Sequence, residues 1–342
     1  MDVLIILLLF LLFYKAKPSS CLLIDAFSLE QTRYINGFFV IHVFIRHFFQ
    51  YIEPGSYDLL LYKYDVFSQQ LIVVPFLFFS GYAMMYKLTA EKSYLNRIVF
   101  KALILWFKFL SVVILYFLLY VSGGNPISLE TVLLSFFGLN SFGNSTWYVI
   151  VIILLWLFSF ISFKVFQNVK FKFIALGLFL AIYAYLINTI KPQIWYNTII
   201  SYYLGMLFFK FESSIKNRLE KKGEFVLLAV LGLLIVFVCF YYSENIIIYE
   251  IRVISFVVLI VLFCYRIKIG NIVLKWLGKY AFEIYMLQRL PMILFRGVIN
   301  NNMLYFVVSM VITVLISIAF KNLWSLIISF VSKNFRIRYI RN

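Results

Sequence analysis

Long apolar segments, separated by short connections rich in lysine and arginine, occupy almost the whole chain. An apolar helix needs about 20 residues to cross the hydrocarbon core of a bilayer. The strands of a membrane barrel would alternate apolar and polar residues, whereas the segments here are continuous. We read them at 3–14, 34–52, 69–88, 98–121, 146–165, 171–190, 193–211, 224–242, 245–265, 277–298 and 303–331. This pattern predicts an all-α fold, a polytopic transmembrane helix bundle with about 10–11 spans.

The composition excludes a soluble protein. The chain is 64% apolar and only 13% charged, with a mean hydropathy of +0.97. Soluble domains contain about 45–50% apolar and about 25% charged residues, so a soluble core could not bury this many apolar side chains. We therefore expect a multi-pass protein of the inner (plasma) membrane.

The cations that give the chain its net charge of +17 are concentrated on one side of the membrane. When the connections are assigned alternately to two sides, roughly 23 of the 31 Lys and Arg residues fall on one side, which the positive-inside rule makes cytoplasmic. Four more lie inside spans, namely Arg46, Lys108, Arg289 and Lys321. This asymmetry requires no nucleic-acid partner.

The chain divides into three parts without a low-complexity linker. Residues 1–33 form a hydrophobic N-terminal anchor and a cytoplasmic linker, residues 34–331 the membrane domain, and residues 332–342 a basic cytoplasmic tail. Segment 3–14 is short for a full crossing. Asp2 precedes its apolar run and lysines follow it, which reverses the charge order of a cleaved signal peptide. We favour an outward-facing anchor over a helix that lies in the interface.

The second apolar segment carries polar groups that are costly inside lipid. At 100° per residue, Asn36 and His47 lie within about 20° of one meridian of a helix, and Arg33 and Tyr51 lie within about 40° of His47. Since a charged group near the middle of a membrane costs several kcal/mol, such groups face the bundle interior or water. His47 is therefore a candidate functional residue. For His42 and Arg46, on a second polar face, we favour helix packing and anchoring.

Residues 27–51 resemble the first conserved helix of the acyltransferase-3 family; they read FSLEQTRYINGFFVIHVFIRHFFQY. Members of this family are integral-membrane enzymes that O-acylate envelope molecules. The family pattern is a cation, Gly, apolar residues and then His. Gly37 and His47 match it, whereas Asn36 stands at the cation position and Arg33 is the nearest basic residue on that face.

Five further segments resemble family motifs in the expected order. They are PFLFFSGYAMMYKL at 75–88, YLNRIVFKALILW at 94–106, GNSTWYVIVIILLW at 143–156, YYLGMLFFKF at 202–211 and LGKYAFEIYMLQRLPMIL at 277–294. The chain departs from the family at Ala281, where Ser is usual, at Gln288, where His is common, and at Ile152, where Glu is frequent. The likeness covers most of 27–331.

The resemblance implies a membrane O-acyltransferase that moves an acyl group, most often acetyl from acetyl-CoA, to a hydroxyl of a cell-envelope or capsular saccharide. A histidine suits the base that such a hydroxyl needs near neutral pH. The expected catalytic residues are His47, as base or less readily as an acyl-carrying nucleophile, with Asn36 and Arg33 on the same face. We expect a lipid bilayer, acyl-CoA and a saccharide as partners, and no metal. Whether the protein forms a homo-oligomer is left open.

Further candidates could bind the acyl-CoA or the saccharide. Each also has a plainer interpretation as a helix contact, an interfacial aromatic or a positive-inside anchor. Glu283 and Arg289 are six residues apart, which places them on opposite sides of a helix with separate partners. Glu283 could orient His47, or it could pair with Lys108 or Arg252. The binding candidates are Ser80, Gly81, Tyr82, Arg97, Trp147, Tyr148, Glu283, Tyr285 and Gln288.

Three other functions remain open at this point. A transporter or flippase of a lipid-linked saccharide would suit the number of spans, although the chain shows no internal duplication of the kind common in transporters. A glycan polymerase would usually carry a large polar outer loop, and the longest here, at 122–145, has Glu130 as its one charged residue. A catalytically degenerate member of the family is suggested by Asn36, Ala281 and Gln288.

Overall fold

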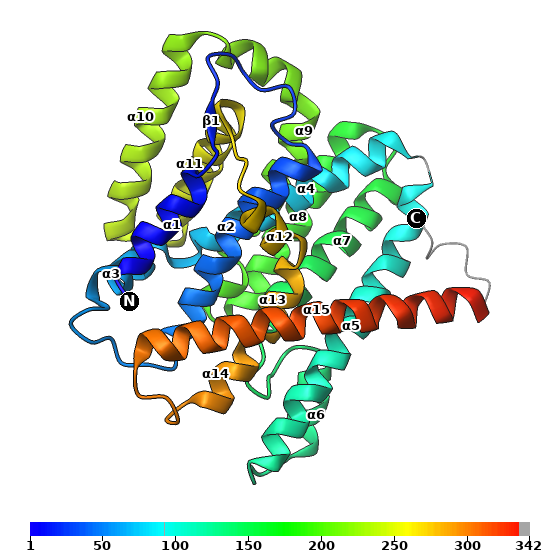
Figure 1. The fold of residues 1–342 in the computed structure, drawn as a ribbon. Coiled ribbons are helices and arrows are strands. Elements are labelled where there is room, and N and C mark those ends of the chain that lie inside the picture. Colours follow the sequence, from blue (N-terminus) through cyan, green and yellow to red (C-terminus); the bar gives the residue numbers. More distant parts are fainter. Residues whose placement is uncertain (92, 335–342) are drawn as a thin grey trace. The chain divides into compact units, whose positions relative to one another are not determined.

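The computed structural model describes residues 1–91 and 93–334, so most of the predicted basic tail, residues 335–342, lies outside the described residues. The all-α fold is confirmed (Figure 1). The α-helices are α1 (Val3–Phe13), α2 (Leu29–Phe48), α3 (Leu59–Ser68), α4 (Val74–Ala90), α5 (Tyr94–Ser122), α6 (Leu129–Phe136), α7 (Trp147–Val165), α8 (Val169–Asn188), α9 (Ile200–Leu219), α10 (Lys222–Val238), α11 (Ile246–Arg266), α12 (Ile272–Lys279), α13 (Ala281–Leu287), α14 (Arg289–Phe295) and α15 (Asn302–Asn334).

Short elements connect these helices. Three 3₁₀ turns, η1 (Gln69–Val73), η2 (Gln193–Trp195) and η3 (Cys239–Tyr242), lie next to helix ends. The two-residue strands β1 (Lys17–Pro18) and β2 (Ile267–Lys268) pair antiparallel. This pairing ties the connection after α1 to the end of α11.

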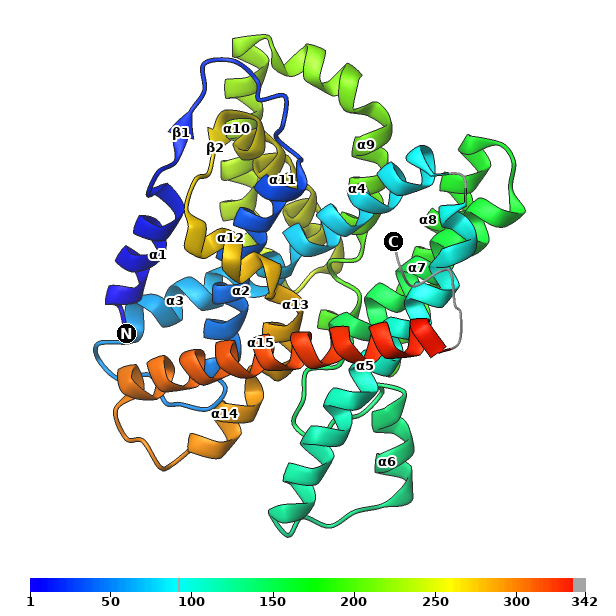
Figure 2. The same ribbon diagram turned by 45° about the vertical axis from the view of Figure 1, so that its right-hand side comes forward.

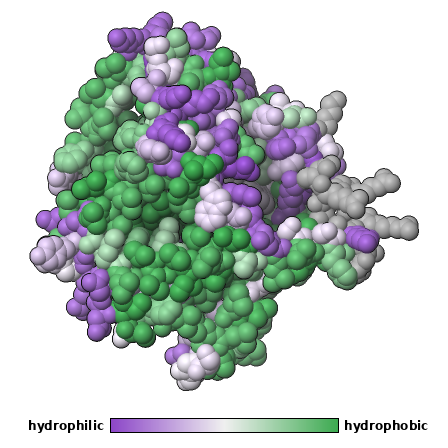
Figure 3. Space-filling view, viewed as in Figure 1, coloured by the Kyte–Doolittle hydropathy of each residue, from purple (hydrophilic) through white to green (hydrophobic). Residues whose placement is uncertain are grey.

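The described residues include seven helices that are long and apolar enough to cross a membrane. They are Leu59–Ala90, Tyr94–Ser122, Trp147–Val165, Val169–Asn188, Lys222–Tyr242, Ile246–Arg266 and Asn302–Val331. Apolar side chains cover broad areas of the surface in Figure 3, as expected where helices face lipid. The first segment, α1, is an eleven-residue helix, shorter than the roughly 20 residues that a full crossing needs.

The predicted continuous span over 277–298 is wrong, because the structure divides it into α12, α13 and α14. Pro291 has no N–H to donate to the carbonyl of Leu287, and this interrupts the helix near Gln288. Tyr280, between α12 and α13, departs from helical geometry with φ −111° and ψ 8°. Both breaks lie within a continuous apolar run, so the apolar pattern did not predict them.

The chain forms two compact units, which are described separately. Unit 1 comprises residues 1–43, 54–92 and 165–279, and unit 2 comprises residues 44–53, 93–164 and 280–342. Helix α2 contributes its first part to unit 1 and its last turn to unit 2.

Glycines allow helices of unit 1 to pack closely. A Cβ atom at Gly81 of α4 would lie 1.9 Å from the Tyr202 carbonyl oxygen of α9, and one at Gly205 would lie 2.0 Å from the Phe78 carbonyl oxygen. Gly37 of α2 meets the Leu274 backbone of α12 in the same way. Small residues at such crossings let helix backbones approach within a membrane.

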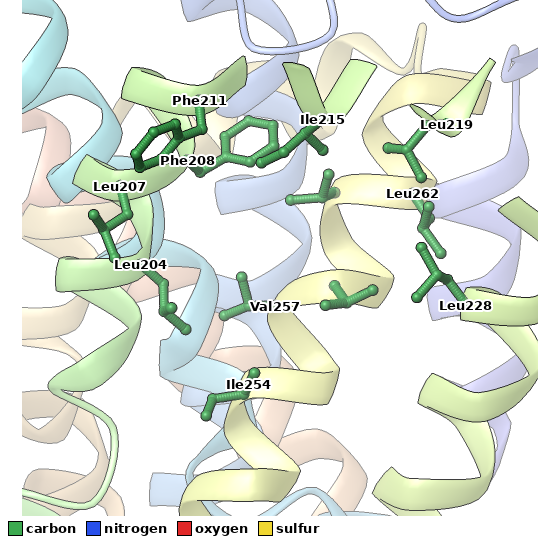
Figure 4. Close-up of a pocket in the computed structure, with 12 residues that line it drawn as sticks. Leu204, Leu207, Phe208, Phe211, Ile215, Leu219, Leu228, Ile254, Val257 and Leu262 are labelled. Atoms are coloured by element: carbon green, nitrogen blue, oxygen red, sulfur yellow. The ribbon is translucent and has the colours of Figure 1, made fainter. Parts of the chain in front are cut away.

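An apolar groove of about 260 Å³ lies between α9, α10 and α11 of unit 1 (Figure 4). Its lining includes Leu204, Phe208 and Leu262, and no charged side chain among the described residues lines it. Such a groove provides no group for chemistry on a polar substrate, so a site for that chemistry has to be sought among polar side chains.

Unit 2 is organised around the long helix α15, which packs against α13 and α14, while α5 contacts α6 and α13 (Figure 2). The last turn of α2 joins this unit through two fully buried rings. The ring centroid of Phe44 lies 5.3 Å from that of Phe306, and the centroid of Phe48 lies 4.7 Å from that of Tyr305. These contacts hold the turn that carries His47.

Candidate active site

His47 occupies the last turn of α2 and is buried, with 9% of its surface exposed. Its nearest polar partner is Arg289, at the start of α14. Arg289 Nη2 lies 2.7 Å and Arg289 Nε 3.2 Å from His47 Nδ1. The same guanidinium donates a hydrogen bond to Gln50 Oε1. One arginine therefore contacts both His47, in the last turn of α2, and Gln50, in the turn that follows α2.

The partner determines which nitrogen of His47 carries the proton. A guanidinium is permanently protonated and has no acceptor atom, so it can only donate. His47 Nδ1 must then accept, and the proton of the neutral ring lies on Nε2. The site thus presents an N–H at Nε2, while the Nδ1 lone pair is occupied by a fixed positive charge.

An aromatic wall adjoins His47 within unit 2. The ring centroid of Tyr285 lies 6.2 Å from that of His47, and the centroid of Tyr148 lies 5.4 Å from that of Tyr285. Trp147 extends the wall, with its centroid 5.8 Å from that of Tyr148. The structure therefore brings together four of the residues singled out in the sequence, from α2, α7 and α13.

Glu283 does not orient His47. Its carboxylate binds Lys108 Nζ at 2.5 Å and Lys321 Nζ at 3.5 Å. Arg289, six residues later, instead binds His47, so the two charged residues have separate partners as their helical spacing predicts. Of the alternatives left open for Glu283, the structure selects Lys108.

Gln288 lies between these two charged residues and is fully buried. Its Nε2 donates to the Tyr285 carbonyl oxygen at 3.2 Å. Within the described part of the chain its Oε1 atom has no hydrogen-bond partner. A buried acceptor without a partner is costly, which makes this amide a candidate contact for a bound molecule.

A family model described as an acyltransferase domain matches residues 33–321, which is most of the chain. The chain belongs to the acyltransferase-3 family. No curated protein and no solved structure matches it. The chain is accordingly a multi-pass membrane acyltransferase.

The two other expected catalytic residues, Asn36 and Arg33, lie earlier on α2. Asn36 is eleven residues and Arg33 fourteen residues before His47, which corresponds to about 16 Å and about 21 Å along the helix. They share its face but do not contact it. Asn36 Oδ1 is buried and has no hydrogen-bond partner among the described residues. A catalytic role for Asn36 or Arg33 stays a prediction.

The other candidates on α4 and α5 have identifiable contacts of their own. Gly81 packs against the Tyr202 backbone, and Ser80 precedes it on α4. Tyr82 donates to Glu212 Oε2 at 2.8 Å, within unit 1. Arg97 is buried at the start of α5, 5.6 Å from the ring centroid of Tyr94. None of these contacts tests substrate binding, so the substrate roles of the four residues stay predictions.

The second histidine of α2 has a different environment. His42 Nδ1 lies 2.9 Å from the Phe38 carbonyl oxygen, which can only accept, so Nδ1 carries the proton. The ring centroids of Phe38 and Tyr64 lie 4.3 Å and 5.5 Å away. His42 is thus a packed and hydrogen-bonded residue of unit 1.

The sequence placed Gln50 beside the face of His47 and Arg289 among the polar residues of a late span, but it assigned neither residue a role in the site. The signal for Arg289 was present, because it is one of four cations that fall inside predicted spans, where a charge needs a partner. Nothing in the local sequence indicates that the partner lies 242 positions earlier.

Proposed function

We propose that this acyltransferase transfers an acyl group from acyl-CoA to a hydroxyl of a cell-envelope saccharide, and that the acyl group is acetyl. The observation that carries the proposal is a buried neutral histidine bound at Nδ1 by a guanidinium and flanked by aromatic rings. Family membership supports the reaction type. Acyl-CoA is the co-substrate, and the inner (plasma) membrane is the proposed location.

The chemistry requires two proton transfers, from the hydroxyl to His47 and from His47 to the CoA sulfur, and one stabilised oxyanion. The acceptor hydroxyl attacks the thioester carbonyl carbon, the carbon–oxygen bond forms and the carbon–sulfur bond breaks. The proton of the hydroxyl finally reaches the CoA sulfur. His47 accepts the hydroxyl proton at Nδ1 once Arg289 has moved away from that nitrogen. General base catalysis contributes a rate factor of about 10² to 10⁴.

Arg289 gains a second partner when it leaves His47. The developing oxyanion attracts a guanidinium, which supplies paired N–H donors in a site that excludes water. A single movement of Arg289 then frees the base and places a positive charge where negative charge develops. Tyr148, Tyr285 and Trp147 provide flat surfaces against which a sugar ring stacks.

The test is the ester content of the surface saccharide. We expect mass spectrometry to find an acyl mass increment in cells with the wild-type chain and to find it lost with His47→Ala. His42→Ala, which removes the other buried histidine of α2, should retain it per molecule of protein. Equal ester content with and without His47 would overturn the proposal, as would a wild-type chain that adds no mass.

A further inference from the structure

Four buried polar side chains of unit 2, called the polar cluster below, carry hydrogen-bonding atoms that have no partner among the described residues. These atoms are Gln288 Oε1, the Tyr285 hydroxyl, Ser145 Oγ and Asn144 Nδ2. Each of the four residues exposes at most 7% of its surface. Buried polar groups are normally hydrogen-bonded, because water cannot replace a bond that the protein leaves unmade. The four atoms therefore call for a molecule that completes their hydrogen bonds.

Backbone contacts fix the orientation of both amides in the polar cluster. Gln288 Nε2 donates to the Tyr285 carbonyl oxygen at 3.2 Å. Asn144 Oδ1 accepts from the Phe142 backbone N–H at 3.1 Å. A carbonyl oxygen can only accept and a backbone N–H can only donate, so neither amide can be turned over. Gln288 thus offers an unused acceptor, and Asn144 offers an unused donor.

The loop before α7 brings these groups together. The Tyr285 hydroxyl lies next to the Ser145 side chain, but within the described part of the chain it completes no hydrogen bond. At Gly143 an added Cβ atom would lie 2.9 Å from Ile293 Cδ1 of α14. The loop therefore runs along α13 and α14 between positions 285 and 293, and Gln288 lies within that interval.

The polar cluster adjoins the proposed base. The ring centroid of Tyr285 lies 6.2 Å from that of His47. Arg289, which directly follows Gln288, places its Nη2 atom 2.7 Å from His47 Nδ1. A molecule bound by the polar cluster would therefore lie beside the imidazole that accepts the proton in the proposed reaction.

The unused atoms match sugar hydroxyls better than a thioester. They comprise one amide acceptor, one amide donor and two side-chain hydroxyls, which can donate or accept. A sugar hydroxyl also donates and accepts, so neighbouring hydroxyls of one ring can satisfy the whole polar cluster. A thioester carbonyl only accepts, and it cannot satisfy Gln288 Oε1. None of the four side chains is charged, which suits a neutral ligand.

We propose that Asn144, Ser145, Tyr285 and Gln288 form a subsite that binds hydroxyls of the acceptor other than the one acylated. This inference rests on the proposed function and narrows its acceptor to a compound with several neighbouring hydroxyls. Gln288 accepts from such a hydroxyl, and Asn144 donates to one. The four side chains are positioning residues, because they determine which hydroxyl reaches His47.

The experiment measures acyl transfer by the purified full chain from labelled acetyl-CoA to envelope saccharide taken from cells that lack the chain. Ser145→Ala and Tyr285→Phe each remove one unused hydroxyl and keep the rest of the side chain. Each should raise the KM for the saccharide about 2- to 12-fold, which is the value of one neutral hydrogen bond. The KM for acetyl-CoA should stay constant, and the melting temperature without substrate should stay the same or rise.

Ser162→Ala is the matched control. Ser162 is another fully buried serine of unit 2 whose Oγ has no partner among the described residues. It lies 15 residues after Trp147, or about 22 Å along α7. Its replacement should leave both KM values at those of the wild type.

The position of the ester in the product separates a positioning role from a structural one. NMR of the wild-type product should find the ester mainly on one hydroxyl of the sugar. The double variant Ser145→Ala/Tyr285→Phe should distribute it over more hydroxyls. A wild type that acylates several hydroxyls equally would contradict the positioning role.

An unchanged KM for the saccharide in both single variants would overturn the subsite. If the melting temperature also fell, the unused atoms would belong to a buried water or to the fold. A raised KM for acetyl-CoA alone would likewise overturn the subsite and assign the polar cluster to the donor. If the wild type transfers acyl groups while these results appear, only the subsite fails; a wild type that transfers none refutes the proposed function itself.

Discussion

Arg289 donates to His47 Nδ1 at 2.7 Å across 242 positions of sequence, and this contact determines the state of the ring. It leaves the proton on Nε2 and occupies the lone pair that a base would use. His42, five residues earlier, has the opposite tautomer because it faces a carbonyl oxygen. The two histidines of one helix therefore differ in chemistry as well as in surroundings.

The role of Arg289 predicts a graded effect of substitution. Arg289→Gln removes the charge and should reduce kcat by about 10²-fold, since one lost oxyanion donor typically costs 10²–10³. Arg289→Lys keeps the charge but loses the planar fork, so it should retain more activity than Gln. Arg296→Gln, an exposed arginine beyond α14, is the control. Equal kcat in all four proteins would exclude Arg289 from the reaction.

The aromatic wall predicts an effect on the acceptor rather than on the donor. Tyr148→Ala removes one ring of the wall, and we expect a rise in KM for the saccharide of about 5- to 8-fold, because losing roughly 40–50 Å² of apolar contact costs about 1 kcal/mol. The KM for acyl-CoA should stay constant. Tyr148→Phe keeps the ring and should behave as wild type. The measurement is steady-state kinetics with each substrate varied in turn. A raised KM for acyl-CoA with a constant KM for the saccharide would show that the wall binds the donor.

The glycine contact between α4 and α9 predicts a loss of stability in unit 1. Gly81→Ala places a Cβ atom 1.9 Å from a backbone oxygen, so the two helices must separate. Overpacking of this kind costs about 1–3 kcal/mol, and the melting temperature in detergent should fall. At Gly223 no atom lies within 4 Å of an added Cβ, so Gly223→Ala should leave the melting temperature the same or higher. An unchanged melting temperature in Gly81→Ala would contradict the close packing.

An ion pair next to the β1–β2 connection predicts a small pH dependence. Lys268 Nζ lies 2.8 Å from Asp25 Oδ2, and this hydrogen bond lowers the pKa of Asp25 below its ordinary value. The contribution to stability is therefore complete above about pH 3.9, the unfolded pKa, and is lost as the pH falls through the lowered pKa. Since both side chains are about half exposed, the contribution of this ion pair to the free energy of unfolding should not exceed about 1 kcal/mol.

The measurement compares the melting temperatures of wild type and Asp25→Asn from pH 7 to pH 3. The wild type should be slightly more stable at pH 7, and the difference should shrink toward the acid end. A difference that grows on acidification would show that the pair does not act in this way.

The sequence predicted much of the fold and part of the site. Apolar runs identified the helices, and the angular position of His47 indicated an interior face, because helix periodicity is a local property. The same calculation separated the partners of Glu283 and Arg289. The breaks near Tyr280 and Gln288 interrupt a run that stays apolar, and the Arg289–His47 contact joins distant segments, so neither had a local signal.

The most direct test of the account is acyl transfer by the purified chain from labelled acetyl-CoA to an envelope saccharide, measured for wild type, His47→Gln and His42→Gln. Glutamine at 47 can still accept a hydrogen bond from Arg289 but cannot take up the proton of the hydroxyl. We predict that His47→Gln loses about 10²- to 10⁴-fold in kcat and that His42→Gln stays near wild type. Wild-type kcat in His47→Gln would show that the imidazole is not the base.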